Sequence, residues 1–338
     1  MTGRLAQLWR YPVKSMLGER LSAAEVTATG VTGDRGLALV HWETGRVASA
    51  KHPRRWRGLL TLRASGAAPG PVRIILPDGR TVSSVDAEVD EVLSRVLGAP
   101  VTLTGTPPDG AVLDRARPEA VLDAGVTADV PVDLSPLGTA APGTFFDFAP
   151  IHLVTTATLR RLATETTGPP AGATGRGGGG ATGPFGDATS APDDRASGLP
   201  GPPTGARDDR AGRPGDPTRA PDDRAGGEGP GDGFEPVRYR PNLVIDVPAD
   251  GFVENGWVGR ELRIGDALVL RVLAATPRCA VPTLAHGELP RQVAALRAAA
   301  RLNRVAPLPQ LDPQPCVGAY ALVVRAGRVA QGALVEVG

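Results

Sequence analysis

Two short segments near opposite ends of the chain combine residue types that could bind one ligand. The first is Tyr11-Pro12-Val13-Lys14-Ser15, and the second is Thr276-Pro277-Arg278-Cys279. A lysine and a hydroxyl on a tight loop can hold a phosphate through a point charge and a hydrogen bond. A thiolate is a soft donor that suits soft metals. Together the segments suit a ligand with a phosphate at one end and a soft metal at the other.

Both chemically interesting side chains are rare in this chain. Lys14 is one of only two lysines, against 35 arginines, and Cys279 is one of only two cysteines. Arg278 directly precedes Cys279, and a neighbouring cation favours an ionised thiol. A lone cysteine is otherwise most often a small buried hydrophobe, which is our interpretation of Cys316 because no charge adjoins it.

Three further polar positions could contribute to anion binding. Arg35 follows Asp34, which could fix its orientation, and Arg240 and Asn242 flank a proline that opens a strand. Thr155 ends an apolar run, where a hydroxyl is usually a helix N-cap but can equally present a hydrogen bond to an anion. Each of these residues, taken alone, also fits an ordinary turn or strand end.

Composition excludes several classes of protein. The net charge of +1 predicts neither a nucleic-acid partner nor an anionic membrane surface, and no apolar run of about 18 residues predicts a transmembrane helix. The first residues lack the apolar core of a signal peptide, so we expect a cytoplasmic protein with free thiols. The sequence contains no Ser-His-Asp order and no paired-carboxylate motif, so it does not support a hydrolase. It also contains neither a Gly-rich nucleotide-binding loop nor the residue spacing of a zinc site.

Short apolar or alternating runs separated by Gly, Pro and Asp predict a mainly β fold. We expect strands in the N-terminal part at Leu5–Tyr11, Leu21–Thr29, Leu37–Trp42, Leu59–Arg63 and Val72–Leu76. Helical spacing predicts helices at Asp86–Leu97 and Leu289–Leu302, and Ile151–Leu162 has the pattern of a strand that passes into a helix. After residue 233 the sequence predicts one strand within Tyr239–Asp246, two more within 257–279, and a closing hairpin of Ala319–Val324 with Val329–Val337.

One stretch differs in kind from the rest of the chain. Residues 168–233 hold 19 Gly and 11 Pro among 66 residues, and the phrase Asp-Asp-Arg-Ala occurs there three times. This exceeds the roughly 25–30% Gly plus Pro that is typical of low-complexity chain. Such a segment buries too little apolar surface to offset its ordering entropy, so we predict a disordered insertion. We expect two β-barrel-like domains with a few short helices, over residues 1–110 and 111–338, the second interrupted by the insertion.

Several motifs together resemble the MOSC family, named for the C-terminal domain of molybdenum cofactor sulfurase, preceded by its N-terminal β-barrel domain. The resemblance covers roughly residues 1–165 and 234–338. The motifs that carry it are Tyr11-Pro12-Val13-Lys14-Ser15 with Gly18, Gly30-Val31-Thr32-Gly33-Asp34-Arg35, Tyr239-Arg240-Pro241-Asn242, Trp257 with Gly265-Asp266, and Arg278-Cys279.

The resemblance implies a site for the molybdenum cofactor, molybdopterin. In relatives similar to the amidoxime-reducing components, a cysteine after an arginine ligates the metal, and this role would fall on Cys279. Contacts to the pterin and its phosphate would fall on Lys14, Ser15, Arg35, Thr155, Arg240, Asn242 and Arg278.

The function implied is an oxidoreductase that reduces N-hydroxylated small molecules. Because no ferredoxin-like module follows residue 338, we expect electrons from a separate reductase partner. The alternative is a cofactor or sulfur carrier that uses a Cys279 persulfide without turnover of its own, since persulfide chemistry also needs an accessible thiol of low pKa. A third alternative is an interaction protein with a vestigial site.

Overall fold

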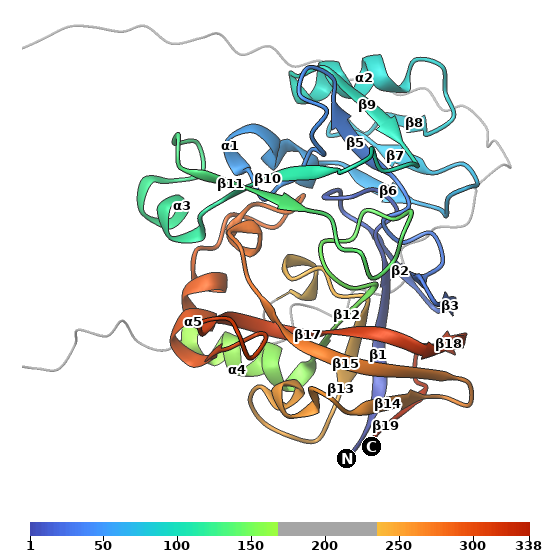
Figure 1. Ribbon diagram of the computed structural model, residues 1–338, viewed down its shortest axis with the longest axis vertical. Coiled ribbons are helices and arrows are strands. Elements are labelled where there is room, and N and C mark those ends of the chain that lie inside the picture. Colours follow the sequence, from blue (N-terminus) through green and yellow to red (C-terminus); the bar gives the residue numbers. More distant parts are fainter. Residues whose placement is uncertain (168–234) are drawn as a thin grey trace, which may run out of the picture. The chain divides into compact units, whose positions relative to one another are not determined.

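The computed structural model describes residues 1–167 and 235–338, and within them strands dominate, as the sequence predicts (Figure 1). The strands are β1 Thr2–Arg10, β2 Glu19–Leu21, β3 Ala23–Thr27, β4 Gly30–Val31, β5 Ala38–His41, β6 Arg63–Ser65, β7 Arg73–Ile75, β8 Thr81–Ser83, β9 Val101–Thr104, β10 Val112–Ala116, β11 Val132–Pro136, β12 Ile151–Thr155, β13 Leu243–Asp246, β14 Glu261–Ile264, β15 Leu268–Pro277, β16 Arg304–Val305, β17 Gln314–Arg325, β18 Gly327–Ala330 and β19 Leu334–Val337. The α-helices are α1 Pro53–Trp56, α2 Val89–Leu97, α3 Pro118–Ala124, α4 Thr156–Thr167 and α5 Ala294–Leu302. Short 3₁₀ turns are η1 Arg57–Thr61, η2 Pro236–Arg238, η3 Val253–Trp257 and η4 Val281–Thr283.

Seven strands close into a barrel. Their order is β12-β13-β1-β19-β14-β15-β17, and β17 pairs again with β12, which completes the circle. The first strand of the chain, β1, lies between β13 and β19, so Thr2 pairs with Glu336 and the two ends of the chain are neighbours (Figure 1). Closure removes exposed strand edges, which are otherwise prone to aggregate.

The barrel is held together by apolar side chains that point to its interior. Leu5 and Leu8 of β1 are fully buried there with Leu243, Leu262 and Leu270 from other barrel strands. Burying such a side chain contributes roughly 1.5–3 kcal/mol each. Burial of these side chains therefore constrains the register of the strands that carry the site.

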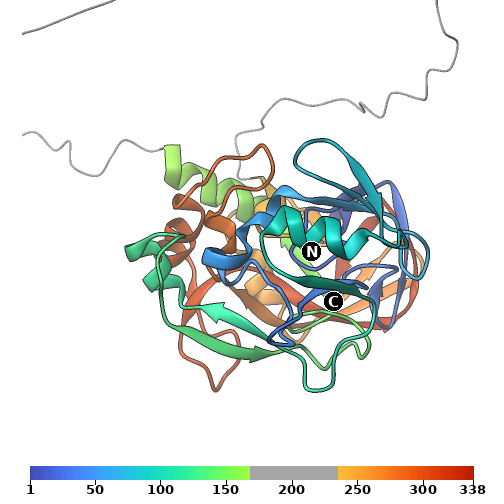
Figure 2. The same cartoon turned by 90° about the horizontal axis from the view of Figure 1, so that it is seen from above.

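The small sheet β18-β3-β4 contributes Val26, Val31 and Val329 to the barrel core. The small sheets β5-β9 and β6-β7-β8 surround a second core. Helix α2 covers this core with Val89 and Leu93, and Figure 2 shows the helix lying across the strands. The predicted helix is confirmed here, although it begins at Val89 rather than Asp86, and Gly98 ends it in the left-handed conformation expected of a C-cap.

Two predictions about strands are wrong. Leu59–Arg63 is not a strand: it lies mostly in η1, which continues directly from the proline-initiated turn α1, and β6 begins only at Arg63. The closing hairpin also does not form, because β18 pairs with β3 and β19 pairs with β1 and β14. An alternating pattern identifies a strand but not its partner, and in a barrel the partners are distant in sequence.

Other differences concern boundaries. Helix α5 begins at Ala294, later than the predicted Leu289, because the preceding residues form a bridge between His286 and Leu289 and a backbone bond from Gln292 to Thr283. The weakly patterned stretch 105–145 contains the β10–β11 ribbon and α3. The predicted disordered insertion at 168–233 lies outside the described residues.

The described residues on both sides of this gap form one compact unit. The proposed division at residue 110 stays a prediction, although β1 from the N-terminal part completes the barrel of the C-terminal part. In the described part of the chain, no helix has both the length and the apolar character needed to cross a bilayer.

Gly18 allows the loop that follows β1 to fold back on the strand. A Cβ atom at this position would lie 2.1 Å from the backbone oxygen of Arg10 and 2.7 Å from the ring of Tyr11. We predict that Gly18→Ala lowers the free energy of unfolding by roughly 1–3 kcal/mol, because backbone must move to make room. Gly256→Ala is the matched control, since its Cβ would meet nothing within 4 Å. Chemical denaturation of both variants checks this, and equal stabilities would refute it.

Candidate functional site

All of the predicted site residues except Thr155 line one cavity of about 700 Å³. Lys14, Ser15 and Arg35 reach it from the loops after β1 and β4, and Arg240 and Asn242 from the segment before β13. Arg278 and Cys279 reach it from the end of β15. The volume lies within the roughly 300–1,000 Å³ that is usual for small-molecule sites.

The buried carboxylate of Asp34 holds three of these segments together. It accepts hydrogen bonds from the backbone N–H of Tyr11 at 2.6 Å and from the Asn242 amide at 2.9 Å, and it pairs with the guanidinium of Arg35. The Asn242 oxygen in turn accepts the backbone N–H of His152 at 3.2 Å. The expectation that Asp34 orients Arg35 is therefore met, and Asn242 acts by positioning its neighbours.

Two guanidinium groups contact the ring of Tyr11. Arg240 stands 4.4 Å and Arg35 4.8 Å from the centre of its ring, so each makes a cation–π contact. Arg240 donates to the backbone oxygen of Met16 at 2.6 Å, but its buried Nη2 has no partner among the described residues. Burial, followed by repulsion from Arg35, lowers the pKa of Arg240 to about 10, which leaves it charged near neutral pH.

The backbone at this site is strained. Ser15, Arg35 and Arg240 have φ angles of 64°, 48° and 55°, and they are the non-glycine residues with positive φ in the described chain. All three line the cavity. Non-glycine residues in this region are uncommon and cost about 1–3 kcal/mol each, and they concentrate at functional sites.

Both lysines of the chain bind one carboxylate in the cavity. Lys14 donates to Asp147 Oδ1 at 2.7 Å and to the backbone oxygen of Phe145 at 2.7 Å, and Lys51 lies 3.0 Å from Asp147 Oδ2. Burial alone would raise the pKa of Asp147, but the two ammonium groups outweigh it and hold this pKa far below its usual range. Burial lowers the pKa of Lys14 to about 8, against the opposing effect of Asp147.

Sequence reasoning missed Lys51 and Asp147. The signal for Lys51 was present, since it is the only lysine besides Lys14. Asp147 stands in a weakly patterned stretch that predicted nothing. Among the described residues, seven cationic side chains and one acid line the cavity; the cations are Lys14, Arg35, Lys51, Arg115, Arg238, Arg240 and Arg278.

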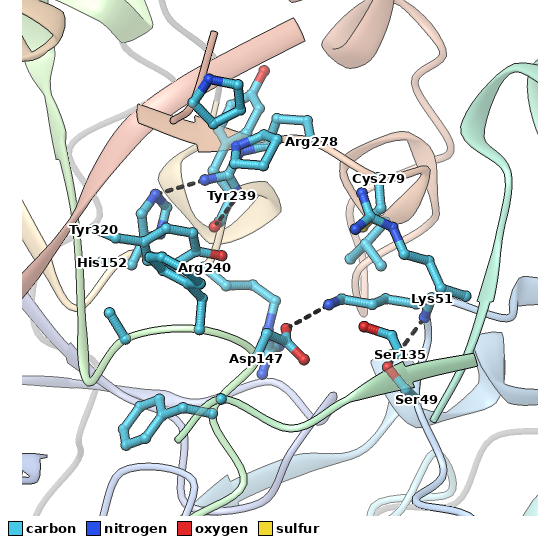
Figure 3. Close-up of a pocket in the computed structure, with 18 of the residues that line it drawn as sticks. Ser49, Lys51, Ser135, Asp147, His152, Tyr239, Arg240, Arg278, Cys279 and Tyr320 are labelled. Carbon is cyan, nitrogen blue, oxygen red and sulfur yellow. Dashed lines mark hydrogen bonds and ion pairs between the residues drawn. The ribbon is translucent and has the colours of Figure 1, made fainter. Parts of the chain in front are cut away.

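The guanidinium of Arg278 forms hydrogen bonds with groups in the wall of the cavity. It donates to the backbone oxygens of Tyr239 at 3.1 Å and Val317 at 2.7 Å, and to His152 Nε2 at 2.6 Å (Figure 3). Because arginine has no acceptor, Nε2 must accept, so the imidazole is neutral. Burial and then Arg278 lower the pKa of His152 well below its usual value.

Cys279 is half-buried at the cavity and packs against Leu60, Val281 and Leu284. Its sulfur therefore has an aliphatic floor while it shares the cavity with the cations. Cys316 differs, because it is fully buried in β17, does not line the cavity, and its burial raises the pKa of its thiol to about 11.

Thr155 lies away from the cavity, so its predicted cofactor contact is not supported. Its hydroxyl accepts the backbone N–H of Thr158 at 3.1 Å, as a helix N-cap does, and donates to the buried Glu254 at 2.8 Å. The sequence left two functions open for this hydroxyl, a helix N-cap and a contact to an anion. In the structure it acts as the N-cap.

This arrangement defines a β-barrel protein whose cavity combines basic side chains with one half-buried thiol. Family comparison matches residues 2–99 to the MOSC N-terminal beta barrel domain and residues 222–336 to the MOSC domain. The chain therefore belongs to the MOSC family, which indicates a molybdenum-cofactor-binding or sulfur-related protein.

Other comparisons add little. Among curated proteins no match is found. Among solved structures, the chain is similar to the YUAD protein from Bacillus subtilis, with 10% identity, a TM-score of 0.38, and coverage of 100% of this chain and 96% of that one. A likeness this weak supports no argument about function.

The chain's two lysines allow a direct test of the electrostatics. We predict that Lys14 titrates near pH 8, because burial disfavours its ammonium form. The charge on Lys14 is present below this pH and is lost above it, so anion binding should weaken as pH rises through 8. NMR of protein labelled with ¹³C at lysine Cε measures the titration, and Lys14→Arg and Lys51→Arg assign the two signals. A Lys14 signal that titrates above pH 10 would contradict the prediction.

Proposed function

We propose that the cavity binds the molybdenum cofactor, with Cys279 as the protein's ligand to the metal. The observation that supports this most is that one cavity contains an accessible thiol and seven cations against a single acid. The unpaired Nη2 of Arg240 is a buried donor without an acceptor, which a bound anion would supply. The residues present therefore fit a ligand that has both a phosphate and a soft metal.

The side chains divide into those that would contact the cofactor and those that would position others. Lys14, Ser15, Arg35 and Arg240 would hold the phosphate and the pterin through charge and hydrogen bonds. Asn242 and Arg278 are fully engaged with protein groups, so they would keep the contacting residues in place. Thr155 has no part in this proposal.

We further propose that the protein reduces N-hydroxylated compounds. Such a reduction takes up two electrons and two protons, breaks the N–O bond and releases water. The bound cofactor would supply two-electron chemistry coupled to removal of an oxygen atom. The cationic cavity would keep the cofactor oriented toward the substrate, and a separate reductase would deliver the electrons.

Metal content tests the role of Cys279. We predict that Cys279→Ala loses most of its molybdenum, because the thiolate is the protein's bond to the metal. Cys316→Ala is the matched control and should retain wild-type molybdenum, because Cys316 lies outside the cavity. Elemental and pterin analysis of the purified proteins measures both. Equal molybdenum in Cys279→Ala and wild type would exclude Cys279 as the ligand.

The half-buried state of Cys279 also supports a sulfur carrier as the second candidate. A persulfide donor would transfer its outer sulfur to the Cys279 thiolate and leave as a thiol. Reduction of a panel of N-hydroxylated bases with an artificial electron donor separates the candidates. Metal-loaded protein that reduces none of the panel would favour the carrier, whereas turnover that is lost in Cys279→Ala would favour the reductase.

A further inference from the structure

The cavity contains cationic side chains that the proposed contacts to the cofactor do not include. Lys51 and Arg115 line the cavity together with Ser135, and none of the three was singled out in the sequence. Figure 3 shows Lys51 and Ser135 on the same side of Asp147 as Cys279, with His152 and Arg240 on the other side.

The backbone holds these residues near one another. The N–H of Ala116, the residue after Arg115, donates to the backbone oxygen of Lys51 at 2.9 Å. In the β10–β11 ribbon Leu113 pairs with Ser135, so Ser135 and Arg115 are diagonal neighbours on one face of the ribbon. The three polar groups thus come from two strands and one loop that are hydrogen-bonded together.

The protein neutralises the charges on this side only in part. Lys51 shares its carboxylate, Asp147, with Lys14, so two ammonium groups face one negative charge. Arg115 makes no hydrogen bond or salt bridge with the described residues, although it stands opposite Asp133 on β11 and its charge acts on that carboxylate. Two nearby arginines differ, since Arg117 forms a salt bridge with Asp133 and Arg46 forms one with Asp114.

We propose that Lys51, Arg115 and Ser135 form a second anion site, which binds a carboxylate or phosphate group of the substrate. A guanidinium binds such a group through two parallel hydrogen bonds, and an ammonium and a hydroxyl can satisfy its remaining oxygen. Exposed apolar side chains also line the cavity, among them Phe148 and Leu311. The substrate class is therefore an N-hydroxylated compound with an apolar body and an acidic group, an inference that rests on the proposed function.

Binding of two matched probes tests this site. We predict that the wild-type protein, as purified, binds 4-carboxybenzamidoxime about 10- to 100-fold more tightly than benzamidoxime, the range expected for a charge-assisted hydrogen bond. Arg115→Met should remove most of this preference, and Arg115→Lys should restore part of it. Isothermal titration calorimetry measures the dissociation constants without requiring turnover. The preference should also shrink as salt is raised.

Arg328→Met is the control, because Arg328 pairs with Glu25 and lies outside both the cavity and the ribbon. It should keep the wild-type preference. Equal binding of both probes by the wild type, or an unchanged preference in Arg115→Met, would overturn the proposal.

Analysis of molybdenum and released pterin in each variant identifies the source of the anion. Loss of cofactor from Arg115→Met would show that the site binds a phosphate of the cofactor and would overturn the assignment to substrate. Absence of molybdenum from the wild type would instead defeat the proposed function. The preference for the carboxylated probe would still decide whether the second anion site exists.

Discussion

The site depends on one buried carboxylate. Asp34 is inaccessible to solvent, and a charge in such a place is costly unless it is paired and hydrogen-bonded. Its partners come from the end of β1, from its own loop and from the segment before β13, which lies more than 200 residues later in the chain. Satisfying this one group therefore brings the N-terminal loops and the barrel into register, and the cavity forms where they meet.

The same arrangement brings several positive charges together in the cavity, which costs free energy. Arg35 and Arg240 both make cation–π contacts with Tyr11, and Ser15, Arg35 and Arg240 all adopt left-handed backbone conformations. Lys14 is buried deeply enough that its pKa falls to about 8. A bound anion would reduce the repulsion among these charges and would give Arg240 Nη2 a hydrogen-bond acceptor. The cavity therefore suits a negatively charged ligand better than a neutral one.

Local features of the fold and site could be predicted from the sequence, and long-range ones could not. The strand character, helix α2 and the loop residues Lys14, Ser15 and Arg35 follow from patterns that span a few residues. The partners of β18 and β19 depend on barrel closure, and no local pattern contains that information. Lys51, Asp147 and Arg115 escaped notice because each becomes meaningful only beside residues distant in sequence. Thr155 is the opposite case, a predicted site residue that does not line the cavity. Its residue type fits both an anion contact and a helix N-cap, and only its position in the fold shows that it is an N-cap.

Cys279 and the basic residues meet because β15 ends beside the loops that Asp34 organises, and the account requires that they hold a single ligand. X-ray absorption at the molybdenum K-edge tests this most directly, in wild-type protein and in Cys279→Ser loaded with the same cofactor. The account predicts that the wild-type spectrum contains one more sulfur neighbour of the metal than that of the variant. Identical sulfur shells in the two proteins would contradict it.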